Sequence, residues 1–402
     1  MSGKEESKIK KRNLNILFLG SDGFPFGMAD VEKQKLIAKG LRLNGAEVTV
    51  ISRKGVHQKN IKMELSAQGI YDGIKYFFAS GTPYRSLNFT KRNLQKFKGV
   101  LSEFLLIYKI HSSQKIDVVI TSNMSIYRII YYWILSRIFG FKLILSYMEY
   151  VKSVSKKTLF NINGRLFDEI IFRFIDAVLP ISNFLINRIE ESNSTIKYLK
   201  VLPLCDFTRF ESDCPPNDTK YFLFCGDANY SEIIRFVVSS FNLIKNDAYE
   251  LFLVINSSTS QTETIYSFIN ESDKKRLIRI FSGLPYEELV NLYRNAKALL
   301  IPLRPTLQDE ARFPHKIGEY LASGNPMITT NVGEIKYYFY DRYNALVCQN
   351  YDEKEYSEKM KFVIENPEMA DKIGKEGRKT GGKYFDYKKA GENIYKFLEN
   401  LI

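Results

Sequence analysis

Short apolar runs of four to seven residues alternate with stretches of helical periodicity along the whole 402-residue chain. Such runs are typical of parallel strands buried on both faces, and the stretches between them are typical of the helices that cover such a sheet. The first series of strands is predicted at 14–19, 47–52, 116–121, 142–146, 176–181 and 198–203. The second is predicted at 221–226, 250–256, 276–281, 297–302, 326–330 and 345–348. The pattern indicates an α/β protein of two tandem doubly wound, Rossmann-like units.

A polar stretch with two prolines separates the two series of strands. A single hydrophobic core stops growing at about 250–300 residues, so a chain of this length is expected to divide into two domains. The predicted parts are a disordered basic tail, a first domain, a linker that acts as a hinge, a second domain and a C-terminal helix. Their ranges are 1–12, 13–205, 206–219, 220–385 and 386–402.

The charge of the chain is distributed unevenly. The formal net charge is +13, and residues 1–200 carry 32 basic and 16 acidic side chains whereas residues 201–402 carry 26 and 29. The first half is therefore expected to meet an anionic partner. Because the basic residues gather around no helix-turn-helix, RRM or zinc motif, nucleic acid is not expected to be that partner.

Cysteine and histidine usage limits the possible chemistry. The four cysteines have no metal-binding or disulfide-framework spacing, which is typical of reduced thiols in the cytosol. Three scattered histidines make a protein-held zinc site unexpected. The charged N-terminal stretch has no apolar segment behind it, so a signal peptide is not expected.

The first strand leads into a glycine-rich loop, Gly20-Ser-Asp-Gly-Phe-Pro-Phe-Gly27, followed by a helix predicted at 29–43. Its glycines allow positive φ angles and let backbone N–H groups approach a phosphate at the helix start. The loop lacks the G-x-G-x-x-G spacing of dinucleotide sites. It therefore indicates either a phosphate-binding turn or only a tight connection between a strand and a helix.

A second loop, from Arg304 to Pro326, carries more chemistry. Pro314 suits the first position of a helix and Gly324 suits the left-handed position that ends one. Between them, Lys316 and Glu319 are three residues apart and share a helix face. They form either a solvent-exposed ion pair or part of a ligand site.

If the loop forms a ligand site, its basic side chains and Glu319 would bind different parts of the ligand. The free N–H groups at the helix start favour an anion, and Arg312, Lys316 and Arg304 would add charge-assisted hydrogen bonds to a diphosphate. Glu319 would accept hydrogen bonds from sugar hydroxyls. The loop therefore predicts a site for a sugar diphosphate.

The segment Glu319-Tyr-Leu-Ala-Ser-Gly-Asn-Pro326 resembles the donor-binding signature of glycosyltransferase family 4, whose members have the GT-B architecture. The resemblance extends over nearly the whole chain in the same order. Further matching segments are Pro25–Ala29, Ala38–Leu41, Ile181-Ser182, Leu202-Pro203 with Asp206 and Phe210, Tyr286–Leu289 with Leu292-Tyr293, Ala296–Pro302, Val332–Glu334 and Asn344–Val347.

The resemblance implies transfer of a sugar from a nucleoside-diphosphate sugar, UDP- or GDP-linked, with retention of configuration and without a metal ion or further cofactor. It implies an active-site cleft between two domains that close on the donor, and a C-terminal helix that crosses back to the first domain. Arg312 and Lys316 would stabilise the leaving diphosphate, and Glu319 would bind the ribose. The other residues expected around the donor are Gly27, Gly226, Phe313, Pro314 and His315.

Two departures from the family pattern leave alternatives open. Ala311 stands where the family has its first glutamate, and the loop at 226–232 has no basic residue to hold the donor phosphates. Arg312 and Lys316 are expected to take over that task. A catalytically impaired donor-binding scaffold and a nucleotide-sugar epimerase of the same architecture remain as alternatives.

The acceptor is predicted from the first domain. Asp22 and Glu149 lie on loops where an acceptor hydroxyl is expected, and no residue suits a covalent nucleophile. A basic helix around 91–106 has an apolar side that suits either an anionic membrane surface or the core, and the aromatic helix at 127–133 suits burial against the sheet or contact with lipid. These features predict a lipid-linked glycan acceptor in bacterial surface polysaccharide synthesis, and a cytoplasmic enzyme at the inner face of the membrane.

Overall fold

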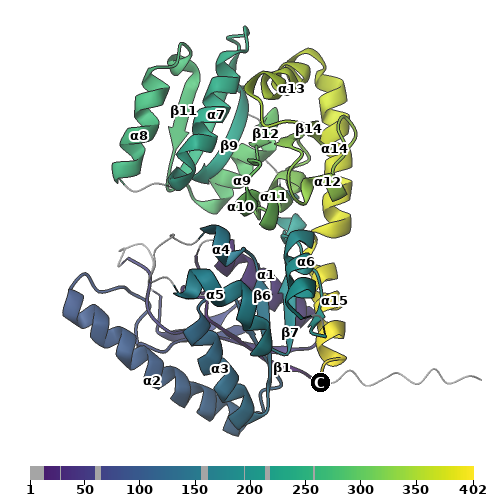
Figure 1. Cartoon of the computed structure of the whole chain (residues 1–402). Helices are drawn as coiled ribbons and strands as arrows, with labels where there is room; N and C mark the ends of the chain where they lie inside the picture. The colour runs from purple at the N-terminus through teal and green to yellow at the C-terminus, as the bar shows by residue number, and fades with distance from the viewer. Residues whose placement is uncertain are drawn as a thin grey trace, which may run out of the picture. The chain divides into compact units, whose positions relative to one another are not determined.

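The computed structural model describes residues 13–27, 29–58, 65–154, 162–193, 195–212, 218–256 and 259–402. They form two compact units (Figure 1). The first comprises residues up to Pro180, Ile186–Val201 and Tyr387–Ile402, and the second comprises Ile181–Leu185 and Leu202–Asp386. The predicted tail at 1–12 and the middle of the predicted linker, 213–217, lie outside the described residues.

The first unit is built on a sheet with the strand order β3-β4-β2-β1-β5-β6-β7-β8. All neighbours are parallel except β3 and β4. The strands are β1 (Asn15–Leu19), β2 (Glu47–Ser52), β3 (Gln68–Tyr71), β4 (Ile74–Phe78), β5 (Val118–Thr121), β6 (Lys142–Tyr147), β7 (Ala177–Pro180) and β8 (Lys197–Tyr198). Strands β5 and β7 are buried along their whole length, as their unbroken apolar runs predict.

Two parts of this sheet differ from the prediction. The hairpin β3–β4 was not predicted, although its turn residues Asp72 (φ 48°) and Gly73 (φ 73°) both adopt the left-handed conformation that a two-residue hairpin turn requires. The strand predicted at 198–203 is wrong in extent, because regular pairing ends at Tyr198. The chain beyond it still follows β7, with the Val201 N–H donating to the Pro180 carbonyl at 2.9 Å.

Helices cover this sheet, and α1 matches its predicted range. They are α1 (Ala29–Leu43), α2 (Phe89–Ser113), α3 (Ile126–Phe139), α4 (Val151–Val154), α5 (Ile162–Ile170), α6 (Asn183–Asn193) and α15 (Tyr387–Glu399), with a 3₁₀ turn η1 (Ile171–Arg173). Helix α15 packs against α1. The contact depends on Gly40 and Gly391, since a Cβ on Gly40 would lie 2.6 Å from the Tyr387 carbonyl oxygen.

The second unit holds an all-parallel sheet with the order β11-β10-β9-β12-β13-β14. Its strands are β9 (Lys220–Asp227), β10 (Tyr249–Asn256), β11 (Ile278–Phe281), β12 (Ala298–Ile301), β13 (Met327–Thr330) and β14 (Leu346–Cys348). Each predicted strand of the second series is present. The 3₁₀ turn η4 (Lys275–Leu277) replaces the start of the strand predicted at 276–281.

Helices lie on both sides of the second sheet in Figure 1. They are α7 (Ser231–Asn242), α8 (Thr259–Asn270), α9 (Tyr286–Asn295), α10 (Leu307–Ala311), α11 (Lys316–Ser323), α12 (Ile335–Tyr338), α13 (Glu353–Glu365) and α14 (Pro367–Tyr384), with 3₁₀ turns η2 (Phe207–Phe210) and η3 (Ala228–Tyr230). Apolar side chains of β9, β10, α7 and α13 form a buried core. Loops at the carboxyl ends of the strands are where such sheets bind ligands.

Candidate functional site

Helix α11 is fixed in place through the hydroxyl group of Tyr320, which is fully buried. This hydroxyl accepts a hydrogen bond from the Cys225 N–H at 3.1 Å and donates to the Leu300 carbonyl at 3.5 Å. The helix ends at Gly324, whose φ of +81° confirms the predicted left-handed cap. Pro314 lies two residues before α11 rather than at its first position, because a turn at His315 comes between them. The result is that the start of α11 faces the carboxyl end of β9.

Lys316 is the first residue of α11 and carries a positive charge at that edge of the sheet. Burial lowers the pKa of Lys316, but the carboxylates of Glu319 and Asp227 and a hydrogen bond with the Cys225 sulfur outweigh burial, so the pKa is raised. Burial raises the pKa of the Cys225 thiol, although Lys316 acts in the opposite direction. The N–H groups of Ile317 and Gly318, predicted to be free for an anion, donate instead to the carbonyls of Pro314 and His315, at 3.2 Å each. The positive charge that suits an anion here therefore comes from the Lys316 ammonium group and the N-terminal end of the helix dipole.

Glu319 lies one turn further along α11 and is half-buried. Its carboxylate accepts a hydrogen bond from the Tyr286 hydroxyl at 3.0 Å. The guanidinium carbon of Arg209 lies 5.1 Å from the centroid of the Tyr286 ring. The predicted i,i+3 neighbourhood of Lys316 and Glu319 is present, and Glu319 already has a protein partner that a ligand hydroxyl would join or replace.

Asp309 organises two arginines before the helix. Its carboxylate is fully buried and ion-paired to Arg312 at 2.6 Å and to Arg304 at 3.0 Å. Arg312 also donates to the Tyr230 hydroxyl at 2.6 Å, and its guanidinium carbon lies 4.6 Å from the centroid of that ring. Arg304 makes a further ion pair with the exposed Glu232 at 3.3 Å. A buried carboxylate is stable only with such partners, so Asp309 and its arginines form one unit.

Sequence reasoning missed Asp309 and Tyr230 as members of the site. The three-residue spacing of Asp309 and Arg312 was a weak signal for their pairing, whereas nothing local indicates Tyr230. The Nε atom of Arg312 is buried and has no hydrogen-bond partner among the described residues. The guanidinium of Arg312 is thus held through its two Nη atoms, by Asp309 and Tyr230.

Hydrogen bonds from two other segments of the second unit hold the loop before α11 in place. The Ser182 hydroxyl donates to the Ala311 carbonyl at 2.5 Å, and the Gly333 N–H donates to the Glu310 carboxylate at 3.1 Å. The buried carboxylate of Glu334 accepts a hydrogen bond from the Asn183 N–H. The segments singled out at 181–182 and 332–334 therefore serve to position the loop that carries Arg312.

The remaining residues predicted for the donor have different surroundings. Phe313 is buried, stacks on Tyr338 and contacts Phe385, so its side chain packs the loop. Pro314 and His315 are half-buried in the turn before α11. Gly226 lies near the end of β9, where a Cβ would lie 2.7 Å from the Phe224 ring. The structure therefore brings Arg312, Lys316, Glu319 and Gly226 to one edge of the second sheet.

The predicted residues of the first unit lie at the carboxyl ends of its strands. Asp22 accepts hydrogen bonds from the N–H groups of Arg53 at 2.8 Å and Lys54 at 3.3 Å, so it ties its loop to the end of β2. Gly27 precedes α1, and a Cβ there would lie 2.5 Å from the Val31 side chain. Glu149 is half-buried after β6. Within the described residues, no group of three or more His, Cys, Asp or Glu side chains could hold a metal ion.

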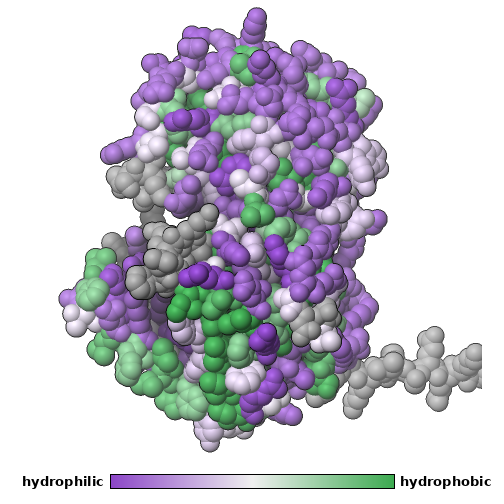
Figure 2. All heavy atoms as spheres, viewed as in Figure 1, coloured by the Kyte–Doolittle hydropathy of each residue, from purple (hydrophilic) through white to green (hydrophobic). Residues whose placement is uncertain are grey.

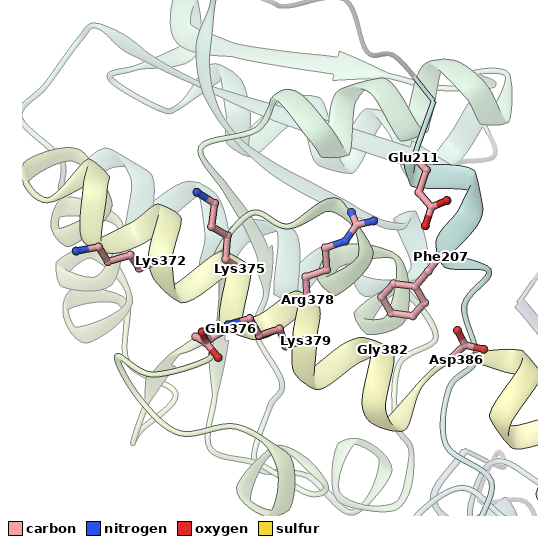
Figure 3. Close-up of a pocket in the computed structure, with 9 residues that line it drawn as sticks. All are labelled: Phe207, Glu211, Lys372, Lys375, Glu376, Arg378, Lys379, Gly382 and Asp386. Carbon is pink, nitrogen blue, oxygen red and sulfur yellow. Dashed lines mark hydrogen bonds and ion pairs between the residues drawn. The ribbon is translucent and has the colours of Figure 1, made fainter.

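A pocket of about 590 Å³ lies elsewhere in the second unit, between η2 and α14 (Figure 3). Its charges are mixed, since Glu211, Glu376 and Asp386 line it together with lysines of α14. Arg378 from this pocket donates a hydrogen bond to the Ala322 carbonyl, near the C-terminal end of α11, where a positive charge is favourable. The pocket contains none of the residues that the sequence singles out for the donor.

Comparison with known proteins relates the second unit to a family. Residues 208–380 match the family described as glycosyl transferases group 1. No curated protein matches the chain by sequence. No helix within the described ranges is long and apolar enough to cross a membrane.

Solved structures share the fold of the whole chain. A sucrose-phosphate synthase from Thermosynechococcus elongatus is similar with a TM-score of 0.77 and 16% identity, over 97% of this chain and 99% of that one. A glycosyltransferase from Rickettsia africae ESF-5 is similar with a TM-score of 0.72 and 15% identity, over 97% of this chain and 98% of that one. HepE from Anabaena, in complex with UDP and glucose, is similar with a TM-score of 0.69 and 13% identity, over 96% of this chain and 100% of that one. The predicted fold class, two Rossmann-like domains of the GT-B architecture, is confirmed.

Proposed function

We propose that this chain, which its group 1 domain identifies as a glycosyltransferase, moves a sugar from a nucleoside-diphosphate sugar to a hydroxyl group of a lipid-linked glycan. The observation that carries the proposal is the position of Lys316. It stands at the start of α11 beside the end of β9, with its pKa raised and with Arg312 on the preceding loop. Positive charge in this position would stabilise a departing diphosphate in the transition state.

The donor is proposed to bind across the start of α11. Lys316 would hold the diphosphate at the positive end of the helix dipole, and Arg312, fixed by Asp309, would add a second cation. Glu319 would accept hydrogen bonds from ribose hydroxyls, in place of or in addition to the Tyr286 hydroxyl. The complexes of HepE with UDP and with UDP-glucose support a uridine donor, and GDP is the second nucleotide to test.

The chemistry is proposed to belong to family 4, with retention of the anomeric configuration. Because two protein cations serve the leaving group, we propose a reaction that needs no metal ion and no cofactor besides the donor. Asp22 and Glu149 are proposed to lie on the acceptor side, where each would accept a hydrogen bond from an acceptor hydroxyl.

The biological setting is proposed from the basic first half of the chain. A lipid-linked acceptor would bring the enzyme to the inner face of the cytoplasmic membrane as a peripheral protein, in the synthesis of a bacterial surface polysaccharide. Similarity to WaaG, a glycosyltransferase involved in lipopolysaccharide biosynthesis, is consistent with this setting.

A donor-binding scaffold without catalysis is the second candidate. Ala311, in the place of the family's first glutamate, is fully buried and offers no side-chain contact to a sugar. A scaffold would bind nucleoside diphosphate and release none from a nucleotide sugar. An epimerase would convert the donor without an acceptor.

One experiment separates these functions. The full chain is incubated with a panel of UDP- and GDP-sugars, with and without a bacterial membrane extract, and nucleoside-diphosphate release and labelled organic-phase product are measured. The proposal predicts release and product that both depend on the extract. Binding without release would indicate a scaffold, and a changed sugar without an extract would indicate an epimerase.

A further inference from the structure

Helix α2 turns an apolar face away from the protein. The residues that it buries are Gly99, Glu103 and Ile107. Large apolar side chains on its other side are 40–66% exposed, namely Leu94, Phe97, Leu101, Phe104, Leu105 and Tyr108. Phe89, at the start of the helix, and Val100, on its flank, are exposed as well. A surface helix of a soluble protein normally buries its apolar stripe in the core. Of the two predicted roles for this apolar side, core packing is therefore wrong.

The apolar surface continues onto α3. Phe139 of α3 has its ring centroid 6.3 Å from that of Phe104 and 5.2 Å from that of His111, both on α2. Helix α3 exposes Tyr127, Ile134 and Ile138, which lie on one side of the helix because they are seven and four residues apart. We call the exposed apolar residues of α2 and α3 the α2–α3 face. Figure 2 shows hydrophobic residues gathered over the part of the first unit where these helices lie.

The same two helices carry no acidic side chain on their surface. Glu103 is the only acidic residue of α2, and α3 has none. Glu103 is fully buried, where it pairs with Arg53 and accepts a hydrogen bond from the Tyr132 hydroxyl at 3.3 Å. This internal pair holds α2 with its acidic residue inward and its apolar side outward.

Basic residues border the apolar stripe. Lys91, Lys98 and Lys109 are seven and eleven residues apart, about two and three helical turns, so they share one flank of α2. Arg137, at the end of α3, is also exposed, and it makes a long ion pair of 4.0 Å with the largely buried Asp176. The exposed charged side chains of the two helices are therefore all cations. Such an apolar face matches the headgroup region of an anionic bilayer, whereas a protein partner would require no such one-sided charge.

We propose that the α2–α3 face docks on an anionic lipid bilayer, with the apolar side chains inserted at the boundary of headgroups and acyl chains. Helix α2 would lie in the plane of the membrane, because its 25 residues are long enough to cross a bilayer but not apolar enough. The inference deepens the proposed function, on which it rests for the lipid-linked acceptor.

Insertion and electrostatic attraction respond differently to salt and to substitution. The full chain should bind vesicles of phosphatidylglycerol and phosphatidylcholine more tightly than phosphatidylcholine alone, and high salt should remove only part of the binding. Replacing Phe97, Leu101 and Leu105 together by serine should lower the partition coefficient by at least about tenfold at both salt concentrations. Replacing Lys91, Lys98 and Lys109 by glutamine should lower it at low salt only.

A matched control uses exposed apolar residues of the same unit outside the face. Leu43 and Ile70 are 64% and 69% exposed, and their replacement by serine should leave vesicle binding unchanged. Because all these positions are exposed, the variants should keep the circular dichroism and nucleoside-diphosphate binding of the parent. A loss of vesicle binding in both serine variants would indicate unspecific adhesion and overturn the proposal.

Fluorescence reports insertion directly, because Trp133 is the only tryptophan. In a Trp133→Phe background, Phe97→Trp should shift the emission to the blue on vesicles, and brominated acyl chains should quench it. Ile70→Trp in the same background should show neither effect. Unquenched emission from the vesicle-bound Phe97→Trp variant would contradict insertion.

Two further results distinguish docking on a membrane from docking on a second copy of the chain, and distinguish failure of the docking proposal from failure of the proposed function. If the α2–α3 face joins two copies of the chain, sedimentation will show a dimer that the Phe97, Leu101 and Leu105 substitutions dissociate, and vesicle binding will be absent. That result overturns the proposal. If the protein binds vesicles by this face but releases no nucleoside diphosphate from any donor, the docking surface stands and the proposed function fails.

Discussion

The carboxylate of Asp309, fully buried, lies 2.6 Å from the guanidinium of Arg312, and it binds Arg304 as well. This arrangement decides how Arg312 meets a ligand. Two Nη atoms are used by Asp309 and Tyr230, so the guanidinium has a fixed plane before any donor arrives. A preoriented cation loses little conformational freedom when a phosphate binds.

Asp309→Asn is expected to weaken both stability and activity. Two guanidinium groups would lose the carboxylate that compensates them in a largely buried position, so the free energy of unfolding should fall by about 3 kcal/mol, measured by urea denaturation. Turnover should fall because Arg312 is no longer oriented. The control is Glu232→Gln, which removes an 80% exposed partner of Arg304 and should cost under about 1 kcal/mol. Equal effects of the two substitutions would contradict the central place of Asp309.

Glu319→Gln is expected to weaken binding of the donor and of the free nucleoside diphosphate together, since the carboxylate is assigned to the ribose. Isothermal titration calorimetry with UDP and GDP measures this. Tyr286→Phe serves as the control, because it removes the present hydrogen-bond partner of Glu319 and leaves the carboxylate in place. Normal affinity of the Glu319 variant would show that this residue acts elsewhere.

Lys33 makes the stability of the first unit depend on pH. Burial lowers its pKa to about 7, and its ammonium group lies 3.3 Å from the Val201 carbonyl oxygen, to which it donates. Between pH 7 and about 10 the unfolded chain binds this proton and the folded chain does not, so Lys33 destabilises the fold less as the pH rises. Lys33→Met removes this dependence.

The measurement is the free energy of unfolding of Lys33→Met minus that of the parent, at pH 7 and at pH 9.5. The difference should decrease by about 2–3 kcal/mol between the two pH values. Lys109→Met, at an exposed position, should show a constant difference. A constant difference for Lys33→Met would mean that Lys33 does not titrate near neutrality in the folded protein.

The order of strands and helices could be predicted because each apolar run is buried within a single element. The β3–β4 hairpin was not predicted, because its strands are short and because β3 (Gln68–Tyr71), at the sheet edge, alternates between exposed and half-buried residues without an apolar run. The orientation of α2 could not be predicted from its pattern. Its inner face is set by Glu103, whose partner Arg53 is fifty residues away in sequence.

In the site, too, local features could be predicted from the sequence and contacts between distant segments could not. Lys316, Glu319 and Gly324 are local features of one helix and its cap, so their spacing is sufficient to relate them. Tyr230 becomes a neighbour of Arg312 only when β9 and β12 pair in the sheet, whereas Asp309 is three residues from Arg312 on the same segment and gave only a weak local signal. A basic residue after β9 was expected from the family pattern, and the structure places an aromatic ring there instead.

The rate of nucleoside-diphosphate release by Lys316→Ala tests the account most directly. The parent, Lys316→Ala and Lys379→Ala are compared at saturating donor with membrane extract as the acceptor source; Lys379 is an exposed lysine paired with Glu376 on α14. Lys316→Ala should fold normally and lose about 100-fold or more in turnover, because the leaving diphosphate loses its principal cation, whereas Lys379→Ala should match the parent. A loss below about threefold in Lys316→Ala would contradict the assignment of the donor site to the start of α11.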